Sequence, residues 1–161
     1  MAVRDAFTAE EWARVVAAPM LAGIAVTAAE PGGLWGAVRE SVAVAGAVRA
    51  GKADADPLVA EIAAAYESAA GRDQARGVLK TEVKGKSAAE VVDVAVAELG
   101  AVAGLVAAKA PDAAPGFREW LKSIAARVAE AGTEGGFLGF GGEKVSAAET
   151  ATLDRIATAV G

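Results

Sequence analysis

The sequence predicts an all-α protein, a single-domain bundle of about seven helices that spans residues 1–161. Three observations lead to this prediction. Apolar residues recur every three or four positions along most of the chain, which is the repeat of a helix with one buried face. Start signals of the Ser/Thr-x-x-Glu type precede several of these stretches. No stretch combines strand-like alternation with enrichment in β-branched and aromatic residues, so no sheet is expected.

The expected helices cover residues 8–18, 20–29, 33–50, 57–70, 73–83, 88–109, 115–131 and 147–160. The first of them begins with a capping box, in which Thr8 and Glu11 can each bond the other's backbone N–H. Phe7 and Trp12 stand where a hydrophobic staple would hold this start. Pro19 removes a backbone donor and crowds the preceding turn, so we expect a break or a kink there. The first two helices then count as one kinked helix or as two.

The middle of the chain is expected to hold three helices. The helix at 33–50 is indicated by one apolar stripe, formed by Leu34 or Trp35, Val38, Val42, Ala45 and Val48. Asp56 before Pro57 is typical of an N-cap followed by proline in the first helical position. Gly71 is expected to close that helix, and a short helix at 73–83 follows.

The last three helices show the clearest patterns. A second capping box, Ser87 to Glu90, opens the helix at 88–109, whose apolar residues cover most of its sides and predict a central place. The helix at 115–131 has a regular amphipathic stripe that begins at Phe117. Ser146 and Glu149 cap the final helix, 147–160.

The composition excludes several classes of chemistry. The chain has no histidine and no cysteine, so mechanisms that need an imidazole base or a thiolate, and the usual zinc, copper and haem ligands, are ruled out. It carries 16 Lys and Arg residues against 21 Asp and Glu residues, a net charge of −5. Because affinity for nucleic acid depends on clustered cations, we expect no nucleic-acid partner.

The chain also lacks recognisable targeting signals. Residues 1–5 show no cationic head before an apolar stretch and no small-residue cleavage site, so a cytoplasmic location is expected. The longest uncharged run, Val15–Ala29, is shorter than the roughly 20 residues of a spanning helix and contains Pro19. No transmembrane segment is therefore expected.

One segment is not explained by helix rules, the glycine-rich stretch at 132–142. It combines six glycines with Phe137, Leu138 and Phe140, which an exposed loop would normally avoid. One interpretation is a structural loop whose large side chains fold back as a lid on the core. The other is a binding site for a partner or an apolar ligand, with Phe137, Leu138, Phe140 and the nearby Lys144 as its residues.

Other motifs yield no site. The glycine-rich stretch does not match a Walker A loop, because Gly142 stands where that loop has its lysine. Asp54 and Asp56 are spaced like the start of a calcium loop, but Pro57 follows at once and helix capping accounts for Asp56. Tyr66, the only tyrosine, is expected on the inward face of its helix with its hydroxyl bonded. No catalytic residue, metal or cofactor is expected.

Several stretches resemble those of a group of uncharacterised bacterial all-helical proteins: 7–12, 22–33, 84–87 and the Glu-Gly-Gly-Phe-Leu-Gly-Phe-Gly-Gly stretch at 134–142 before Val145-Ser146. The tail from Val145 to Gly161 also resembles, faintly, the end of a repeat in TerB-type tellurite-resistance proteins. In this sequence glycine and phenylalanine replace the acidic loop that would bind metal in those proteins, so the resemblance implies no metal site. It implies a helical fold and leaves the function open.

Three functions are compatible with the sequence. The first is a non-catalytic helical protein that acts through protein–protein contacts, including self-association, near the loop at 132–144. The second is a carrier or sensor of a small apolar ligand or lipid, held in a pocket between Ala- and Val-lined helices. The third is an enzyme that works without histidine or cysteine, which would need polar groups from distant parts of the chain to meet in one cleft.

Overall fold

The computed structural model describes the backbone of residues 2–29, 36–133 and 145–161, and the side chains of 2–29, 44–131 and 145–161. Within these ranges the chain forms seven α-helices, one 3-10 helix and no strand, so the all-α prediction is confirmed. The elements are η1 (Val3–Ala6), α1 (Ala9–Ala29), α2 (Gly36–Gly51), α3 (Pro57–Ala65), α4 (Ala69–Val83), α5 (Ala88–Lys109), α6 (Ala114–Thr133) and α7 (Ala147–Val160).

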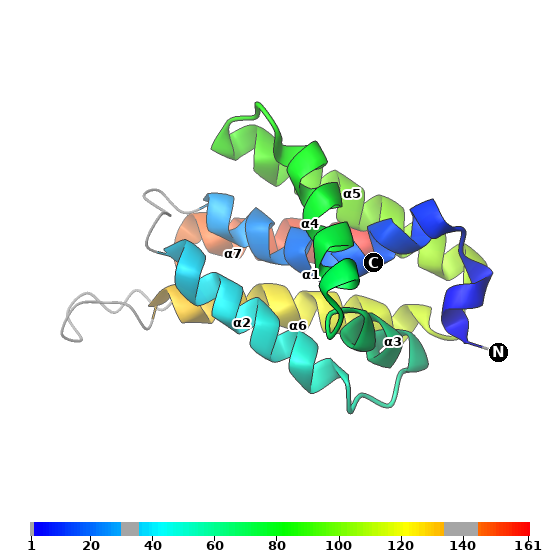
Figure 1. Ribbon diagram of the computed structural model, residues 1–161. Helices are drawn as coiled ribbons and strands as arrows, with labels where there is room; N and C mark the ends of the chain where they lie inside the picture. The colour runs from blue at the N-terminus through cyan, green and yellow to red at the C-terminus, as the bar shows by residue number, and fades with distance from the viewer. Residues whose placement is uncertain (1, 30–35, 134–144) are drawn as a thin grey trace.

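Helix α1 lies at the centre of the bundle (Figure 1). It contacts α2, α4, α5, α6 and α7, and four successive residues, Val15–Ala18, are buried. Because four successive residues point to all sides of a helix, this part of α1 is enclosed by its neighbours. Helix α5, expected to be central, packs mainly on α1 and α7 and leaves small residues such as Ala97 and Ala101 exposed.

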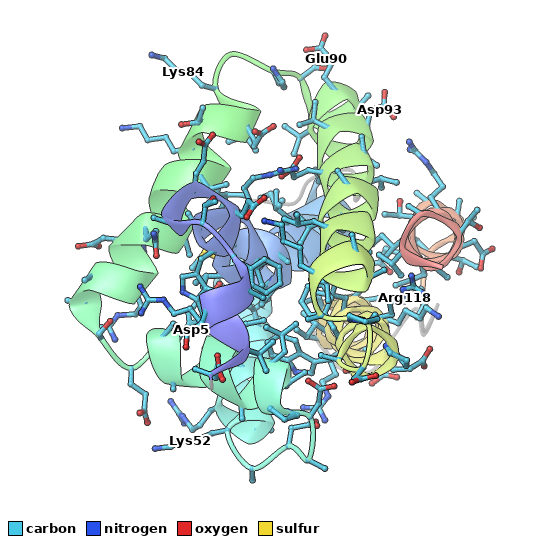
Figure 2. All side chains as sticks on the ribbon, turned by 90° about the vertical axis from the view of Figure 1, so that its right-hand side faces the viewer. Asp5, Lys52, Lys84, Glu90, Asp93 and Arg118 are labelled. Carbon is cyan, nitrogen blue, oxygen red and sulfur yellow. The ribbon has the colours of Figure 1, made fainter. Side chains whose placement is uncertain are left out.

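By length and composition α1 and α5 could each cross a membrane, a property that the core helices of soluble proteins share. In α1, 61% of the apolar window is buried inside the bundle, and in α5 the share is 44%. Charged side chains such as Lys84, Asp93 and Lys52 point outward from the helices (Figure 2). The expected absence of a transmembrane segment and the expected cytoplasmic location both stay predictions.

The start of α1 agrees with its predicted capping signals. The Thr8 backbone N–H donates to Glu11 Oε2 over 2.8 Å, and the Glu11 N–H donates to Thr8 Oγ1 over 3.2 Å. The rings of Phe7 and Trp12 lie 6.2 Å apart. Pro19 does not end the helix: the ranges 8–18 and 20–29 form the single helix α1. Burial on every side of this stretch supplies packing that outweighs the local cost of the proline.

The boundary between α3 and α4 differs from the prediction. The helix expected at 57–70 ends at Ala65, and α4 begins at Ala69, so Gly71 lies inside α4 and does not close the preceding helix. Gly71 allows the start of α4 to approach the end of α3 closely, because a Cβ at Gly71 would lie 2.0 Å from the Ala65 carbonyl oxygen. Ser68 caps α4 by accepting the Gly71 N–H over 2.9 Å. The two helices thus meet in a turn too tight for a side chain at this position.

The remaining start signals are confirmed. The Asp56 side chain accepts from the backbone N–H of Leu58, and both Ser87 and Ser146 form capping boxes. Helix α6 begins at Ala114 and ends at Thr133, slightly wider than the expected 115–131. The described part of α2 begins at Gly36, so residues 33–35 of the expected helix lie outside the described residues.

Two ion pairs join α1 to α5. Arg14 Nε lies 2.6 Å from Glu98 Oε1, and Lys109 Nζ lies 2.6 Å from Glu11 Oε2. The Arg14 side chain is 35% exposed and the Glu98 side chain 16% exposed, so this pair is partly shielded from solvent. It raises the pKa of Arg14, and the hydrogen bond from Lys109 lowers the pKa of Glu11.

Candidate ligand-binding groove

The site residues nominated from the sequence, Phe137, Leu138, Phe140 and Lys144, lie outside the described residues. The two interpretations of that segment, a lid on the core or a contact surface, therefore both stay predictions. The described chain resumes at Val145, which packs against the core, and at Ser146, which caps α7.

The described helices form a groove of about 770 Å³ along α1 and between α2 and α4. Its lining residues come from α1, here called the floor, and from two walls, α2 on one side and α4 with the end of α3 on the other. Its apolar lining comes from all four helices: Met20, Ile24, Val44, Val48, Ala63 and Leu79. Ligand pockets in proteins span roughly 300–1,000 Å³, so the groove is large enough for a small molecule.

The floor of the groove follows from helix spacing. Met20, Gly23, Ile24 and Thr27 are separated by three and four residues and therefore share one face of α1. Gly23 is also where α1 approaches α2, because a Cβ there would lie 2.7 Å from Val44 Cγ2. Met20 and Ile24 are half-buried, as is Leu79 on α4. Large apolar side chains thus gather at the groove without being fully covered by the described residues.

The walls carry a cluster of cations, with Arg49 and Lys52 on or just after α2 and Arg72 and Arg76 on α4. Among the described lining residues the only carboxylate is that of Glu67. Four cations against one carboxylate give this lining a charge of +3, in a chain whose net charge is −5. The groove is therefore positive against an acidic background.

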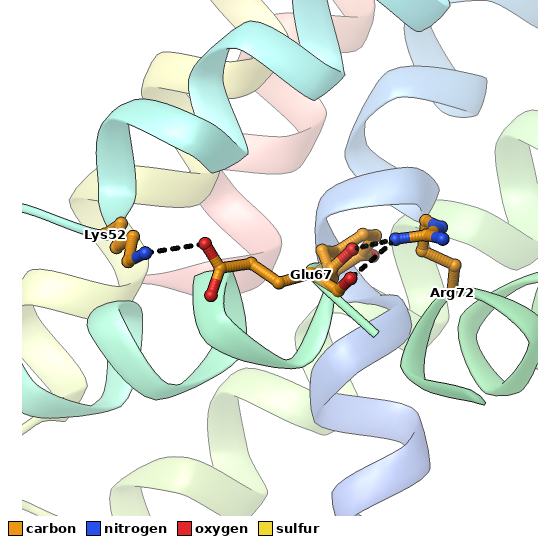
Figure 3. A network of polar contacts seen from close by, with 4 residues as sticks. Lys52, Glu67 and Arg72 are labelled. Atoms are coloured by element: carbon orange, nitrogen blue, oxygen red, sulfur yellow. Dashed lines mark hydrogen bonds and ion pairs between the residues drawn. The ribbon is translucent and has the colours of Figure 1, made fainter. Parts of the chain in front are cut away.

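Figure 3 shows the polar contacts among Lys52, Glu67 and Arg72, three residues that line the groove. Lys52 Nζ lies 2.6 Å from Glu67 Oε1, which joins the end of α2 to the turn after α3. Arg72 Nη1 donates to the carbonyl oxygens of Tyr66 and Glu67 over 2.7 and 3.0 Å. These carbonyls stand at the C-terminal end of α3, where a cation is favourable because of the helix dipole. The guanidinium of Arg72 is thereby fixed at the wall.

Arg49 and Arg76 are held less firmly. Arg76 Nη1 lies 3.5 Å from Asp73 Oδ1, and both side chains of this pair are well exposed, so the pair contributes little. Arg49 is exposed and forms no hydrogen bond or ion pair with any other described residue. Both cations are available to a ligand in the groove.

Tyr66 lines the groove, and its hydroxyl is bonded to the backbone of α1. The hydroxyl donates to the carbonyl oxygen of Val16 over 2.6 Å, in the turn of α1 that Pro19 disturbs. Burial raises the pKa of Tyr66 above its ordinary value, so the phenol keeps its proton at neutral pH. The tyrosine acts as a structural hydrogen-bond donor in α1–α3 packing, in the inward position expected from the sequence.

None of the cations of the groove is among the site residues predicted from the sequence. One signal for the arginines of α4 was present: Arg72, Arg76 and Lys80 recur every fourth residue and so lie along one side of that helix. No comparable signal links them to Arg49, which is brought to the same groove by the fold alone. Within the described ranges, no three acidic side chains gather where they could hold a metal ion. Comparisons with models of protein families, with curated proteins and with solved structures find no match.

Proposed function

We propose that this protein is a non-catalytic carrier or sensor that holds a small apolar molecule in the groove between α1, α2 and α4. The observation that supports this proposal is the set of half-buried apolar side chains, Met20, Ile24 and Leu79, which line a groove of about 770 Å³. An apolar molecule laid against them would remove this surface from water, at about 25 cal/mol for each Å² of apolar area.

The chemistry of the lining favours binding over catalysis. The floor is built from the side chains of Met20 and Ile24, with Gly23 and with Thr27, whose hydroxyl donates to the Gly23 carbonyl oxygen over 2.9 Å. Thioether, aliphatic and hydroxyl groups do not titrate near neutral pH, where a general base has to work. The phenol of Tyr66 is engaged with the Val16 carbonyl and has a raised pKa, so it is a poor general base. An enzyme without histidine would need a titratable group poised near neutral pH, and Tyr66 is shifted away from it.

The first function expected from the sequence, protein–protein contact near residues 132–144, stays a separate proposal. Its residues lie outside the described ranges, so it rests on the sequence pattern alone. Different variants distinguish the two functions. Changes at Phe137 and Phe140 would weaken binding of protein partners, whereas changes in the groove would weaken binding of an apolar ligand.

A matched pair of tryptophan variants tests the groove. Ala45 is exposed and lines the groove on α2, whereas Ala101 is exposed on α5 and does not line it. We expect wild-type protein to bind decanol and the neutral dye Nile red, Ala45→Trp to weaken both about ten-fold or more, and Ala101→Trp to leave both unchanged. Each variant is checked for folding by circular dichroism and thermal unfolding.

Two results would overturn the proposal. The first is equal affinity in folded Ala45→Trp and Ala101→Trp, which would place the ligand elsewhere on the protein. The second is the absence of dye and decanol binding in the wild type, together with no apolar molecule in organic extracts of protein purified from its host. Mass spectrometry of those extracts would also identify a co-purified ligand.

A further inference from the structure

We infer that the ligand of the groove is an amphiphile with an apolar chain and an anionic head group, a carboxylate or a phosphate, bound by Arg72 and Arg76 with Arg49 opposite. This inference rests on the proposed function and names the class of molecule that the groove takes. It follows from three features of the walls: the excess of cations, the fixed position of one arginine, and the arrangement of cations around the apolar floor.

The excess of cations is local. The described lining holds four cationic side chains and one carboxylate, and that carboxylate, of Glu67, is already paired with Lys52. Arg49 and Arg72 have no carboxylate partner among the described residues, and Arg76 has only its exposed pair with Asp73, at 3.5 Å. Like charges brought together in this way repel one another, and an anion placed between them relieves the repulsion.

Arg72 is prepared for binding. Its Nη1 is occupied by the carbonyls of Tyr66 and Glu67, whereas its Nε and Nη2 form no hydrogen bond with the described residues. A guanidinium can bind a carboxylate or phosphate through two parallel N–H groups, and here the free edge belongs to a half-buried arginine that is already immobilised. Less side-chain entropy is therefore lost when an anion binds.

The other two arginines complete the head-group region. Arg76 lies one turn after Arg72 on α4, and Arg49 lies on α2, the opposite wall. The floor between the walls is the apolar face of α1, with Met20 and Ile24 half-buried. An anionic head held between the walls would leave its chain along α1. A neutral apolar molecule would use only the floor, and a cationic amphiphile would be repelled by the walls.

Calorimetric titration with four ligands of one chain length tests the inference: decanoate, decyl phosphate, decanol and decyltrimethylammonium, each below its aggregation concentration. We expect both anions to bind about ten-fold or more tightly than decanol, the value of one charge-assisted hydrogen bond, and the cation to bind more weakly than decanol. The tighter of the two anions identifies the head group. Added salt is expected to weaken binding of the anions and not of decanol.

A matched pair of variants tests the residues. Arg76→Gln removes a cation of the groove, and Arg127→Gln removes an exposed cation of α6 that does not line it, so both change the net charge equally. We expect Arg76→Gln to weaken decanoate binding about five-fold with decanol unchanged, and Arg127→Gln to change neither. Arg72→Gln is expected to have the larger effect on decanoate, and Arg76→Gln remains informative if that variant fails to fold.

The outcomes separate this inference from the proposed function. Equal binding of decanoate and decanol, or equal effects of Arg76→Gln and Arg127→Gln, would overturn the anionic head group and leave an apolar groove. Tight binding of decyltrimethylammonium would overturn it as well. Failure of all four ligands to bind would overturn the groove itself, and with it both statements.

Discussion

Gly71 offers the sharpest test of the packing described above, because a single methyl group there should disrupt the junction of α3 and α4. A Cβ at Gly71 would lie 2.0 Å from the carbonyl oxygen and 2.8 Å from the carbonyl carbon of Ala65. Real Cβ atoms essentially never come within 3.0 Å of another atom, and here the obstacle is backbone, which cannot rotate aside. Gly71→Ala therefore has to push α4 away from α3.

The size of the effect can be estimated from three contributions. Overpacking costs about 1–3 kcal/mol. Displacing the Gly71 N–H from Ser68 Oγ, now 2.9 Å apart, removes a helix cap worth about 1 kcal/mol. Alanine regains about 1 kcal/mol of helix propensity, which offsets the cap. The free energy of unfolding should fall by about 2 kcal/mol, and the midpoint of thermal unfolding by roughly 4–8 °C for a chain of this size.

Gly77, on the same helix, is the matched control. It is exposed, and a Cβ added there would meet nothing within 4 Å. Gly77→Ala should therefore gain the helix propensity alone, about 1 kcal/mol, and unfold roughly 2–4 °C higher than the wild type. Urea and thermal unfolding followed by circular dichroism measure both. A Gly71→Ala protein at least as stable as the wild type would refute the argument, as would a shift of both variants in the same direction.

Three further predictions concern charge and pH. Burial raises the pKa of Tyr66, so the folded state holds the phenol proton more tightly than the unfolded state does. The resulting stability is present below about pH 10 and is lost as the pH rises above it. In urea unfolding, the free energy of unfolding should therefore fall less at alkaline pH in Tyr66→Phe than in the wild type. The pKa of Glu11 is lowered, first by its hydrogen bond with Lys109, so the stability it gives is present above its ordinary pKa of 4.5 and is lost on acidification. In Glu11→Gln, the free energy of unfolding should fall less as the pH is lowered through this range. An unchanged pH dependence would contradict the pairing. Glu98→Ala should cost about 1–2 kcal/mol, and a double-mutant cycle with Arg14→Ala should return a coupling above about 0.5 kcal/mol; strict additivity would show that the pair contributes nothing.

Local signals predicted the fold well where the structure uses local interactions. The capping boxes at Thr8, Ser87 and Ser146 and the cap at Asp56 each place a helix start, because the bonds they form lie within one turn. The prediction for Gly71 was wrong because the role of this residue depends on a contact with the preceding helix, not on the sequence around it. A glycine near the end of an apolar stripe usually closes a helix, and only the position of Ala65 in space shows that this one is needed for close approach.

Pro19 illustrates the same limit. Its local effect is to break a helix, yet α1 continues through it, because the residues around the proline, Val15–Ala18, are buried on all sides of the helix. The side chains that bury them come from helices distant in the sequence. A prediction from a local window can state the cost of the proline, but it cannot include the neighbours that outweigh it.

The groove was harder still to foresee. Its lining comes from one face or one turn of four helices. In the sequence, lining residues such as Met20 and Ile24 on α1 look like ordinary core residues of an amphipathic helix. Arg72 and Arg76 show a helical spacing that marks a cationic side of α4, but such a side is most often a solvated surface. What makes it a candidate site is the apolar floor beside it, which is a property of the packed bundle.

The floor and the walls of the groove should contribute differently to binding. Each methylene buried on the floor contributes about 0.8 kcal/mol, and a charge-assisted hydrogen bond at the wall about 1.5–3 kcal/mol, so the head group equals two to four methylenes. The chain should therefore set most of the affinity, and the arginines should decide which amphiphile is chosen.

The floor on α1, from Met20 to Thr27, is about 10 Å long at 1.5 Å per residue. Affinity should rise with chain length until the chain covers that span and then level off. A steady rise through longer carboxylates in the same titration would mean that the chain lies somewhere other than along α1.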